Sequence, residues 1–416
     1  MSAPAGLVST ISGKTYPLDR LEEFAENGES LEVSLPDIAH ARHRSSPHLW
    51  ERFGDFLPFP DMNPDRSLGE GNTPLIPGGR QLHEWTGLPN LLLKNETQNP
   101  TWSFKDRGSL TCMFLADFLG ERVAATISTG NMGHSLAAYG ARAGVKVIVF
   151  VPGFAPHEKV DAMAIHGATV LRVEAPDYSV MKRHVLGLAG ALGVRIVSGN
   201  GPVRVEGYKL TAFELYEQME GHVPDYIAVP TSACGHVRGI FKGYRELREA
   251  GWIRSIPRFI IVQARNNNPI TGSLNRGEEK IVPVSNVLTI AEAITTGDPP
   301  GGEELLQKAR TFGWLGEDVT EEDILESQRR LAAGGFFVEP AAATSLAAVR
   351  SLVRDRRIDA DATVVLMLTG AGLKDMDVLR HQRCGAKNSS LSTVASDLRA
   401  VLAERTIAPR GTVPDR

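Results

Sequence analysis

Strand-like and helix-like hydrophobic patterns alternate through most of this 416-residue chain. Short apolar runs with the length of buried strands are separated by longer segments with helical periodicity, such as residues 133–143. This alternation favours parallel, doubly wound sheets and therefore an α/β fold. The first group of candidate strands comprises residues 124–128, 145–151, 169–173 and 195–198.

A turn-forming segment, residues 199–202, separates this group from a second one. This second group comprises the candidate strands at residues 226–229, 259–263 and 363–368, with a helix at 211–219. A further candidate strand at residues 91–94 and a helix at 109–119 precede the first group in the chain, and we assign that strand to the second group. We expect two doubly wound α/β domains with a cleft between them. The predicted division is an N-terminal appendage (1–66), a large domain (67–104 and 205–385), a small domain (105–204) and a C-terminal tail (386–416).

Composition restricts the partners of the chain. A net charge of -4 and a pI near 6.3 give no basic surface, so we expect neither nucleic acid nor a membrane as a partner. No signal-peptide pattern opens the chain, and no stretch approaches the roughly 20 apolar residues that span a bilayer. The spacing of Cys112, Cys234 and Cys384 is typical of neither disulfides nor a metal site. These features predict a cytoplasmic protein that binds a small molecule and no metal.

The segment at residues 99–108, Asn-Pro-Thr-Trp-Ser-Phe-Lys-Asp-Arg-Gly, places a lysine at the expected start of a helix. A proline turn precedes Lys105, and the helix N-terminus beside it attracts anions. An amine held in one direction at such a place suits a Schiff base. Taken alone, a lysine in such a turn is far more often a solvated surface lysine, and only the surrounding residues favour a functional role for Lys105.

Residues 99–107 closely resemble the lysine motif Asn-Pro-Thr-x-Ser-Phe-Lys-Asp-Arg of the threonine synthase branch of the fold-type II pyridoxal phosphate (PLP) enzymes. The loop at residues 69–75 is similar to that family's Gly-Glu-Gly-x-Thr-Pro-Leu loop. The resemblance implies that PLP lies in the cleft between the two domains and forms a Schiff base with Lys105. It also implies that Lys105 then moves protons during the reaction.

Two further loops resemble family segments that hold the cofactor and the substrate. Residues 128–135 join a strand to a helix, where N–H groups and hydroxyls can bind an anion or merely cap the helix. By resemblance, Asn131 faces the 3-hydroxyl of PLP, while Ser128 and Thr129 bind the substrate. Residues 366–375 resemble Leu-Thr-Gly-x-Gly-Leu-Lys-Asp, which implies that the Thr369 hydroxyl meets the pyridine nitrogen. A neutral threonine does not enforce protonation of that nitrogen.

The segment at residues 229–237 departs from the family. Relatives bind the PLP phosphate there with a glycine-rich loop, of which only one glycine remains. Hydroxyls and helix N–H groups can still bind a phosphate, so the predicted cofactor residues are Thr231, Ser232, Ala233, Cys234 and Gly235. His236 stands where an asparagine lies near the substrate phosphate in relatives, and it could be neutral or cationic. The Cys234 thiol could have a lowered pKa, but a small residue filling a tight turn is favoured.

Two residues and one pair of serines complete the list of candidates. Arg204 resembles the phosphate-binding arginine of an Arg-x-Glu-Gly-x-Lys segment, although an ion pair with Glu206 or Glu214 is an equal alternative. Glu339, before Pro340, indicates a helix start, and a structural role is favoured over a catalytic one. Serines occupy the positions of a Cys-x-x-Cys pair that relatives carry near the N-terminus, so a zinc site is not expected.

The resemblance implies a PLP-dependent lyase of amino-acid biosynthesis that converts O-phosphohomoserine into threonine. The alternatives are a related enzyme for β- or γ-replacement or elimination on another activated amino acid, as in cysteate synthase, and a Ser/Thr dehydratase. A PLP-binding protein without turnover is disfavoured by the intact Lys105, Asn131 and Thr369. The polar tail, with one amphipathic segment at residues 394–403, either packs loosely or forms a subunit contact, and a homodimer is compatible with the second.

Overall fold

A computed structural model describes residues 5–18, 24–26, 28–153, 155–175, 178–285, 288–382 and 387–404. Cys384 lies outside these residues. The chain forms two compact units, Met1–Met376 and Asp377–Arg416. The second unit contains most of η6 (Met376–His381) and the helix α13 (Val394–Glu404), where the amphipathic segment was expected. The first unit contains three sheets and every site residue considered below.

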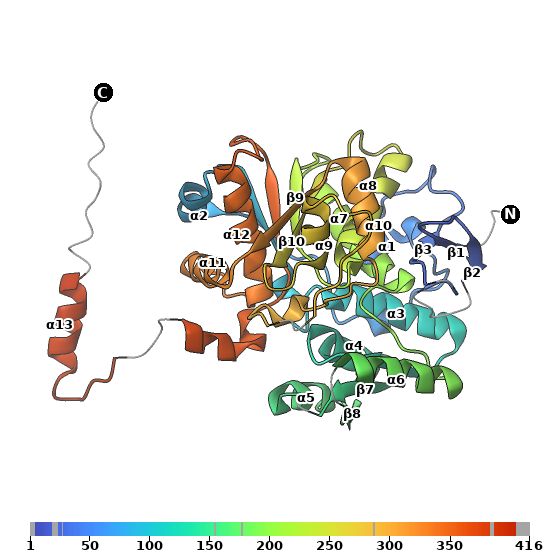
Figure 1. The fold of residues 1–416 in the computed structure, drawn as a ribbon, viewed down its shortest axis with the longest axis horizontal. Helices are drawn as coiled ribbons and strands as arrows, with labels where there is room; N and C mark the ends of the chain where they lie inside the picture. The colour runs from blue at the N-terminus through green and yellow to red at the C-terminus, as the bar shows by residue number, and fades with distance from the viewer. Residues whose placement is uncertain are drawn as a thin grey trace. The chain divides into compact units, whose positions relative to one another are not determined.

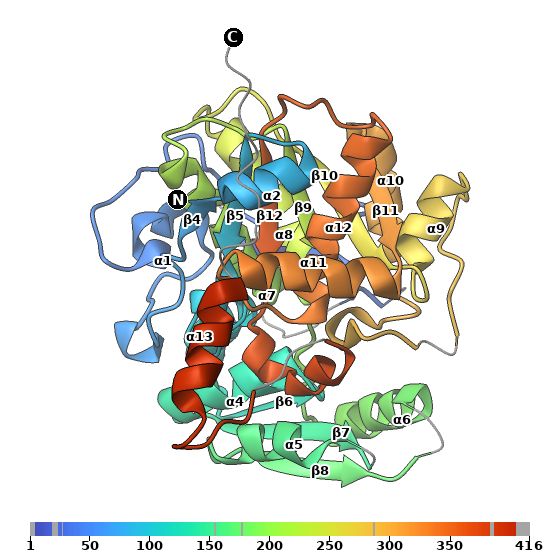
Figure 2. The same ribbon diagram turned by 90° about the vertical axis from the view of Figure 1, so that its left-hand side faces the viewer.

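The largest sheet has six strands in the order β11-β10-β9-β12-β5-β4; Figure 1 labels β9 and β10, and Figure 2 labels all six strands. Its strands are parallel except for β4, which runs antiparallel to β5 at one edge. The predicted strands of the second group are confirmed, whereas β11 was not predicted. The strand bounds are β4 (Leu75–Pro77), β5 (Leu91–Asn95), β9 (Tyr226–Pro230), β10 (Arg258–Ala264), β11 (Leu315–Val319) and β12 (Val364–Leu368).

Apolar residues on both faces of this sheet are buried, as expected for a doubly wound fold. Along β9, Ile227 and Val229 face one core while Tyr226 and Ala228 face another. The first core includes residues of α7 (Pro202–Gln218) and α8 (Gly235–Glu249), and the second includes residues of α11 (Glu321–Ala333) and α12 (Pro340–Arg354). Helices therefore cover both faces, and the carboxyl ends of the parallel strands remain to build a site.

A smaller parallel sheet has the order β6-β7-β8 (Figure 2). It comprises β6 (Val123–Ile127), β7 (Lys146–Pro152) and β8 (Thr169–Val173). The prediction of a fourth full strand at residues 195–198 is wrong, because only Ile196 forms a parallel bridge, to Ala125 of β6. Two main-chain hydrogen bonds accompany this bridge: the Ala125 N–H donates to the carbonyl of Arg195, and the Val197 N–H donates to the carbonyl of Ala125. The two α/β layers agree with the predicted fold class, while the exact domain bounds stay a prediction.

The N-terminal segment forms a small antiparallel sheet in the order β2-β1-β3. Its strands are β1 (Gly6–Ser9), β2 (Thr15–Pro17) and β3 (Leu31–Ser34). Ser9 and Ser12, the two serines at the Cys-x-x-Cys spacing considered above, both donate hydrogen bonds to the Glu29 carboxylate. These hydrogen bonds join the end of β1 and the turn after it to the segment before β3.

Helices occupy the remaining connections. No helix in the described ranges is long and apolar enough to cross a membrane. The α-helices not yet given are α1 (Leu49–Arg52), α2 (Gly79–Thr86), α3 (Lys105–Leu119), α4 (Asn131–Ala143), α5 (His157–Ala164), α6 (Tyr178–Ala191), α9 (Pro269–Asn275) and α10 (Gly302–Phe312). Short 3₁₀ turns are η1 (Gly54–Phe56), η2 (Pro64–Arg66), η3 (Glu96–Gln98), η4 (Glu292–Ile294) and η5 (Gly372–Lys374).

Candidate active site

Lys105 is the first residue of α3, and the turn before it is fixed to the end of β12. The Phe104 N–H donates to the carbonyl of Thr369 at 3.1 Å, and the Ala371 N–H donates to the carbonyl of Trp102 at 3.0 Å. These bonds join two segments that are more than 200 residues apart in the sequence. The lysine motif and the Thr369 motif, found separately in the sequence, therefore form one structure.

The Lys105 amine lies in a poorly solvated place. Its Nζ is 4.3 Å from the centre of the Phe104 ring. Burial, assisted by the nearby Arg204 guanidinium, lowers the pKa of Lys105 to about 7, and Glu339 opposes this shift. An amine with this pKa can accept or donate a proton near neutral pH.

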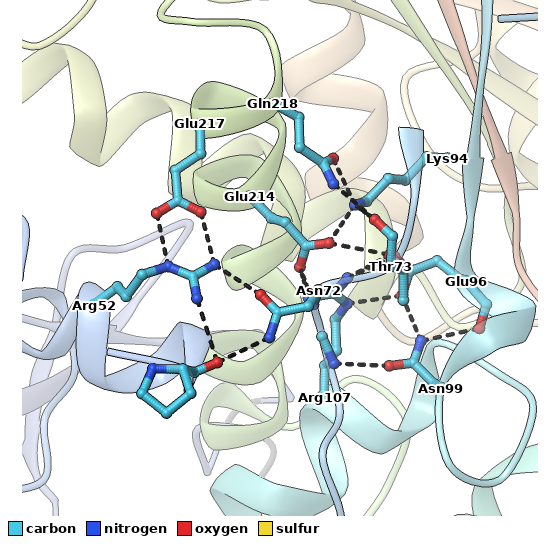
Figure 3. Close-up of polar contacts among 12 residues, drawn as sticks. Arg52, Asn72, Thr73, Lys94, Glu96, Asn99, Arg107, Glu214, Glu217 and Gln218 are labelled. Atoms are coloured by element: carbon cyan, nitrogen blue, oxygen red, sulfur yellow. Dashed lines mark hydrogen bonds and ion pairs between the residues drawn. The ribbon is translucent and has the colours of Figure 1, made fainter. Parts of the chain in front are cut away.

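A charged cluster formed by Lys94, Glu96, Arg107 and Glu214 holds the first turn of α3 (Figure 3). Each of the four side chains is at most 1% exposed. Arg107 donates twice to the Glu96 carboxylate, at 2.7 Å each, and once to Glu214 at 2.8 Å. Although burial opposes it, the Arg107 guanidinium lowers the pKa of Glu96 to about 2. Both signs of charge are matched, and the helix start that carries Lys105 is fixed on two sides.

The loop between β6 and α4 contains the predicted substrate residues. Ser128 Oγ accepts hydrogen bonds from the N–H groups of Gly130 and Gly133, at 3.3 and 3.1 Å. This is the helix-capping arrangement that the sequence left open, and the hydroxyl proton of Ser128 remains available to a ligand. Thr129 is half-buried beside it, and Asn131 is the first residue of α4.

Glu339 is the site residue that sequence reasoning undervalued. It precedes α12 as expected, but its side chain does not cap that helix. Instead, Oε2 accepts from Asn131 Nδ2 at 2.8 Å and Oε1 accepts from Thr369 Oγ1 at 3.3 Å. Burial raises the pKa of Glu339, while both hydrogen bonds and the nearby Lys374 oppose that rise. The only sequence signal was an acidic residue directly before a helix-starting proline.

The segment at residues 231–235 joins β9 to α8, as predicted, but its side chains are mostly occupied. The Thr231 hydroxyl donates to the carbonyl of Val229 at 2.7 Å, and the Ser232 hydroxyl bonds that of Thr296 at 2.6 Å. Donors for an anion therefore come mainly from the main-chain N–H groups of Ala233, Cys234 and the first turn of α8, which have no partner inside the helix.

Gly235 and Cys234 show how closely this turn is packed. A Cβ atom added to Gly235 would lie 2.1 Å from the carbonyl oxygen of Gly199, so only glycine fits there. Cys234 adopts a left-handed conformation with a φ of 77°. Burial raises the pKa of the Cys234 thiol, which argues against a lowered pKa and favours the structural role in a tight turn.

His236 is the second residue of α8 and packs face to face on Phe104, with ring centres 3.8 Å apart. It is 5% exposed, and burial lowers its pKa to about 3, which makes the ring neutral near pH 7. In the part of the chain that the structure describes, neither ring nitrogen has a hydrogen-bond partner. A neutral His236 therefore alters the size of the site more than its charge.

Arg204 lies within the first turn of α7, which begins earlier than the helix expected at residues 211–219. Its side chain is fully buried, and Nη1 donates to Ser109 Oγ at 3.3 Å. Glu206 binds Lys209 and Lys242 instead, and Glu214 belongs to the charged cluster. Both carboxylates that were considered as ion-pair partners of Arg204 thus bind other cations, and the role of Arg204 stays a prediction.

The residues around Lys105 fit PLP. The Ser103 hydroxyl is a buried polar group without a partner among the described residues, as are the ring nitrogens of His236. A bound polar molecule would satisfy such groups, which are costly when left alone. An aldehyde, a phosphate and a ring nitrogen would find an amine, free helix N–H groups and a hydroxyl here. Among the described residues, no three His, Cys, Asp or Glu side chains are placed to hold a metal.

The fold and the half-buried Lys105 define an α/β enzyme whose site lies at the carboxyl ends of parallel strands. A family model described as pyridoxal-phosphate dependent enzyme matches residues 66–370, and the chain belongs to that family. It is 36% identical to the threonine synthase of Methanocaldococcus jannaschii, over 88% of this chain and 92% of that protein. The threonine synthase of Methanosarcina acetivorans is 37% identical, over 79% and 80% of the two chains.

Solved structures agree on the fold. The processed form of threonine deaminase isoform 2 from Solanum lycopersicum has a TM-score of 0.65 at 20% identity, over 82% of this chain and 94% of that one. A fungal L-serine ammonia-lyase from Rhizomucor miehei has a TM-score of 0.62 at 21% identity, over 76% and 99%. The chain is therefore a fold-type II, PLP-dependent lyase of the threonine synthase-like kind.

Proposed function

We propose that this enzyme releases phosphate from O-phosphohomoserine and adds water at Cβ to give threonine. One observation carries the proposal: an amine with a pKa of about 7 lies at the start of α3 beside the buried guanidinium of Arg204. The amine suits proton transfer at neutral pH, and the guanidinium suits a dianionic leaving group. The similarity to threonine synthases supports the choice of substrate.

In this proposal Lys105 holds the cofactor. It then takes the proton from the substrate Cα and moves protons between Cα, Cβ and C4′ during the rest of the reaction. When bound, PLP supplies an electron sink for the charge that develops at Cα. Arg204 binds the leaving phosphate, with His236 beside it, while Ser128 and Thr129 bind the amino-acid end. The remaining cofactor contacts are assigned to Asn131, Thr369 and the segment 231–235.

His236 favours a second candidate, replacement or elimination on a different activated amino acid. Its neutral ring is larger than an asparagine side chain and stacks on Phe104, next to the turn that carries Lys105. A bulkier group at this place would select another side-chain length or leaving group. The amino-acid end of the site would be unchanged, because Ser128, Thr129 and Asn131 lie on a different loop.

A substrate panel separates the two candidates. We expect a kcat/KM for O-phosphohomoserine in the usual enzyme range, about 10⁴ M⁻¹s⁻¹ or more, and much lower values for O-phosphoserine and O-acetyl analogues. Threonine formation is measured by chromatography and phosphate release by a coupled assay. A preference for O-phosphoserine or an O-acetyl analogue would replace the proposed substrate with the second candidate.

The setting of the enzyme follows from the same reasoning. The described cysteines, Cys112 and Cys234, are both buried, which is compatible with the reducing cytoplasm proposed for this protein. A homodimer formed through the C-terminal unit stays a prediction, and sedimentation of the purified holoenzyme tests it.

A further inference from the structure

The Glu339 carboxylate joins two residues from different layers of the fold. Asn131 begins α4 beside the small sheet, while Thr369 follows β12 of the large sheet. The carboxylate is 5% exposed and accepts one hydrogen bond on each oxygen, from Asn131 Nδ2 and from Thr369 Oγ1. A carboxylate can only accept, so both partners must turn a hydrogen toward it.

We propose that Glu339 is a positioning residue that fixes which hydrogen-bonding groups Asn131 and Thr369 present to the cofactor. The amide of Asn131 has two hydrogens, and with one held by Glu339 the other stays free to donate to a ring oxygen. The hydroxyl of Thr369 has one hydrogen, and when Glu339 holds it only lone pairs remain. The inference rests on the proposed roles of Asn131 and Thr369.

The consequence concerns the ring nitrogen of the bound cofactor. A hydroxyl that offers only lone pairs can accept an N–H but cannot donate to a bare nitrogen. Thr369 therefore favours a protonated ring nitrogen, which is the stronger electron sink. This differs from the sequence-based expectation, in which a neutral threonine leaves that proton unspecified. Glu339 therefore acts on the ring nitrogen indirectly, through Thr369.

The backbone holds the carboxylate in this place. The Glu339 N–H donates to the carbonyl of Gly370 at 3.0 Å, and Val338 bridges Ala371 on the same two segments. A Cβ atom at Gly370 would lie 2.6 Å from the Glu339 carboxyl carbon, so the glycine is needed for the approach. Burial raises the pKa of Glu339, while its hydrogen bonds from Asn131 and Thr369 and the nearby Lys374 and Lys105 favour the charged form of the acid.

Glu339→Gln is the direct test, because it keeps the size of the side chain. The glutamine amide must donate to one partner, which reverses the hydrogen-bond direction at Asn131 or Thr369. With ring-¹⁵N-labelled PLP bound, we expect the NMR resonance of the ring nitrogen to move toward the unprotonated position. We also expect the dissociation constant of PLP to rise about tenfold, as for loss of one hydrogen bond to a charged group.

Glu32→Gln is the matched control, since Glu32 is 3% exposed and lies in the N-terminal sheet, bound to Arg245 and Lys308. It should lower the melting temperature without moving the ring-nitrogen resonance. If Glu339→Gln lowers only the melting temperature and leaves both the resonance and PLP affinity unchanged, Glu339 is a simple clamp and the proposal is overturned.

Thr369→Val keeps the test decisive if Glu339→Gln fails to fold. It removes the hydroxyl at nearly constant volume, and the resonance should move in the same direction; an unmoved resonance overturns the proposal. Neither measurement needs substrate turnover. Failure to convert O-phosphohomoserine would therefore refute the proposed function while leaving this inference standing.

Discussion

The charged cluster and the site around Lys105 both contain buried polar groups, but these groups have partners in the cluster and lack them at the site. In the cluster, Arg107 and Lys94 face Glu96 and Glu214, and both signs of charge are matched. At the site, the Lys105 pKa is lowered and the ring nitrogens of His236 have no partner among the described residues. Matched charges hold a structure in place, whereas unmatched polar groups are held ready for a ligand.

The largest expected effect separates the two regions at the lysine. Lys105→Ala should lower kcat by about 10³-fold or more, since a positioned acid–base group contributes that much. Its stability in urea should change little, because the charged cluster remains intact. Borohydride reduction of the wild-type holoenzyme followed by peptide mass mapping should place PLP on Lys105, and an adduct on Lys94 or Lys209 would refute the assignment.

Glu214→Gln should show the opposite pattern. Removing one partner of a buried ion pair leaves charge uncompensated, so the free energy of unfolding should fall by about 3–5 kcal/mol. Urea denaturation of the cofactor-free protein measures it. The control is Glu326→Gln, whose half-exposed partners Arg329 and Arg330 predict a loss below about 1 kcal/mol. Equal losses of unfolding free energy in the two variants would show that burial of the Glu214 ion pairs does not matter for stability.

The lowered pKa of Lys105 predicts a pH dependence for cofactor attachment. Only the neutral amine is nucleophilic, and its fraction falls about tenfold for each pH unit below a pKa of about 7. The rate of covalent attachment of PLP to the cofactor-free protein should therefore rise up to about pH 7 and then level off. Stopped-flow absorbance across this range tests it. A rate still rising toward pH 10 would indicate an ordinary lysine.

The fold class and the family could be predicted from the sequence because the motifs that indicate them are local in the chain. Lys105, Asn131 and Thr369 each lie in a short contiguous motif that can be recognised alone. The hydrogen bonds between the turn before Lys105 and the end of β12 are visible only in the structure, because the two motifs are far apart in the sequence. The charged cluster escaped prediction because its partners are scattered from residue 94 to residue 214.

The errors in the fold have a similar cause. Residues 195–198 have the composition of a strand, but pairing is decided by their neighbours, and only Ile196 bridges Ala125. Glu339 looked like a helix start, which it is, while the direction of its side chain depends on α4 and β12. Tertiary contacts of this kind override local pattern.

A smaller effect is expected at the proposed leaving-group contact. Arg204→Lys removes the planar pair of donors but keeps the charge, so KM for O-phosphohomoserine should rise about tenfold with kcat less affected. The PLP content of the variant, read from its absorbance, serves as the control. Unchanged KM at normal PLP content would remove Arg204 from the substrate site and leave it a role in packing α7 against α3.

The smallest expected effect tests whether His236 belongs with the unmatched groups or is merely packed. Its stacking on Phe104 needs only a flat ring, whereas binding a substrate needs a ring nitrogen. His236→Phe keeps the stacking and removes both nitrogens, while His236→Asn keeps a donor and loses the stacking. If a nitrogen meets the substrate, competitive inhibition of the holoenzyme by inorganic phosphate should weaken about threefold to tenfold in His236→Phe and be retained in His236→Asn.

The reverse order, with normal phosphate inhibition in His236→Phe and a lower melting temperature in His236→Asn, would make His236 a packing residue. In that case the space it fills, rather than any bond it forms, would decide which side chains the site accepts.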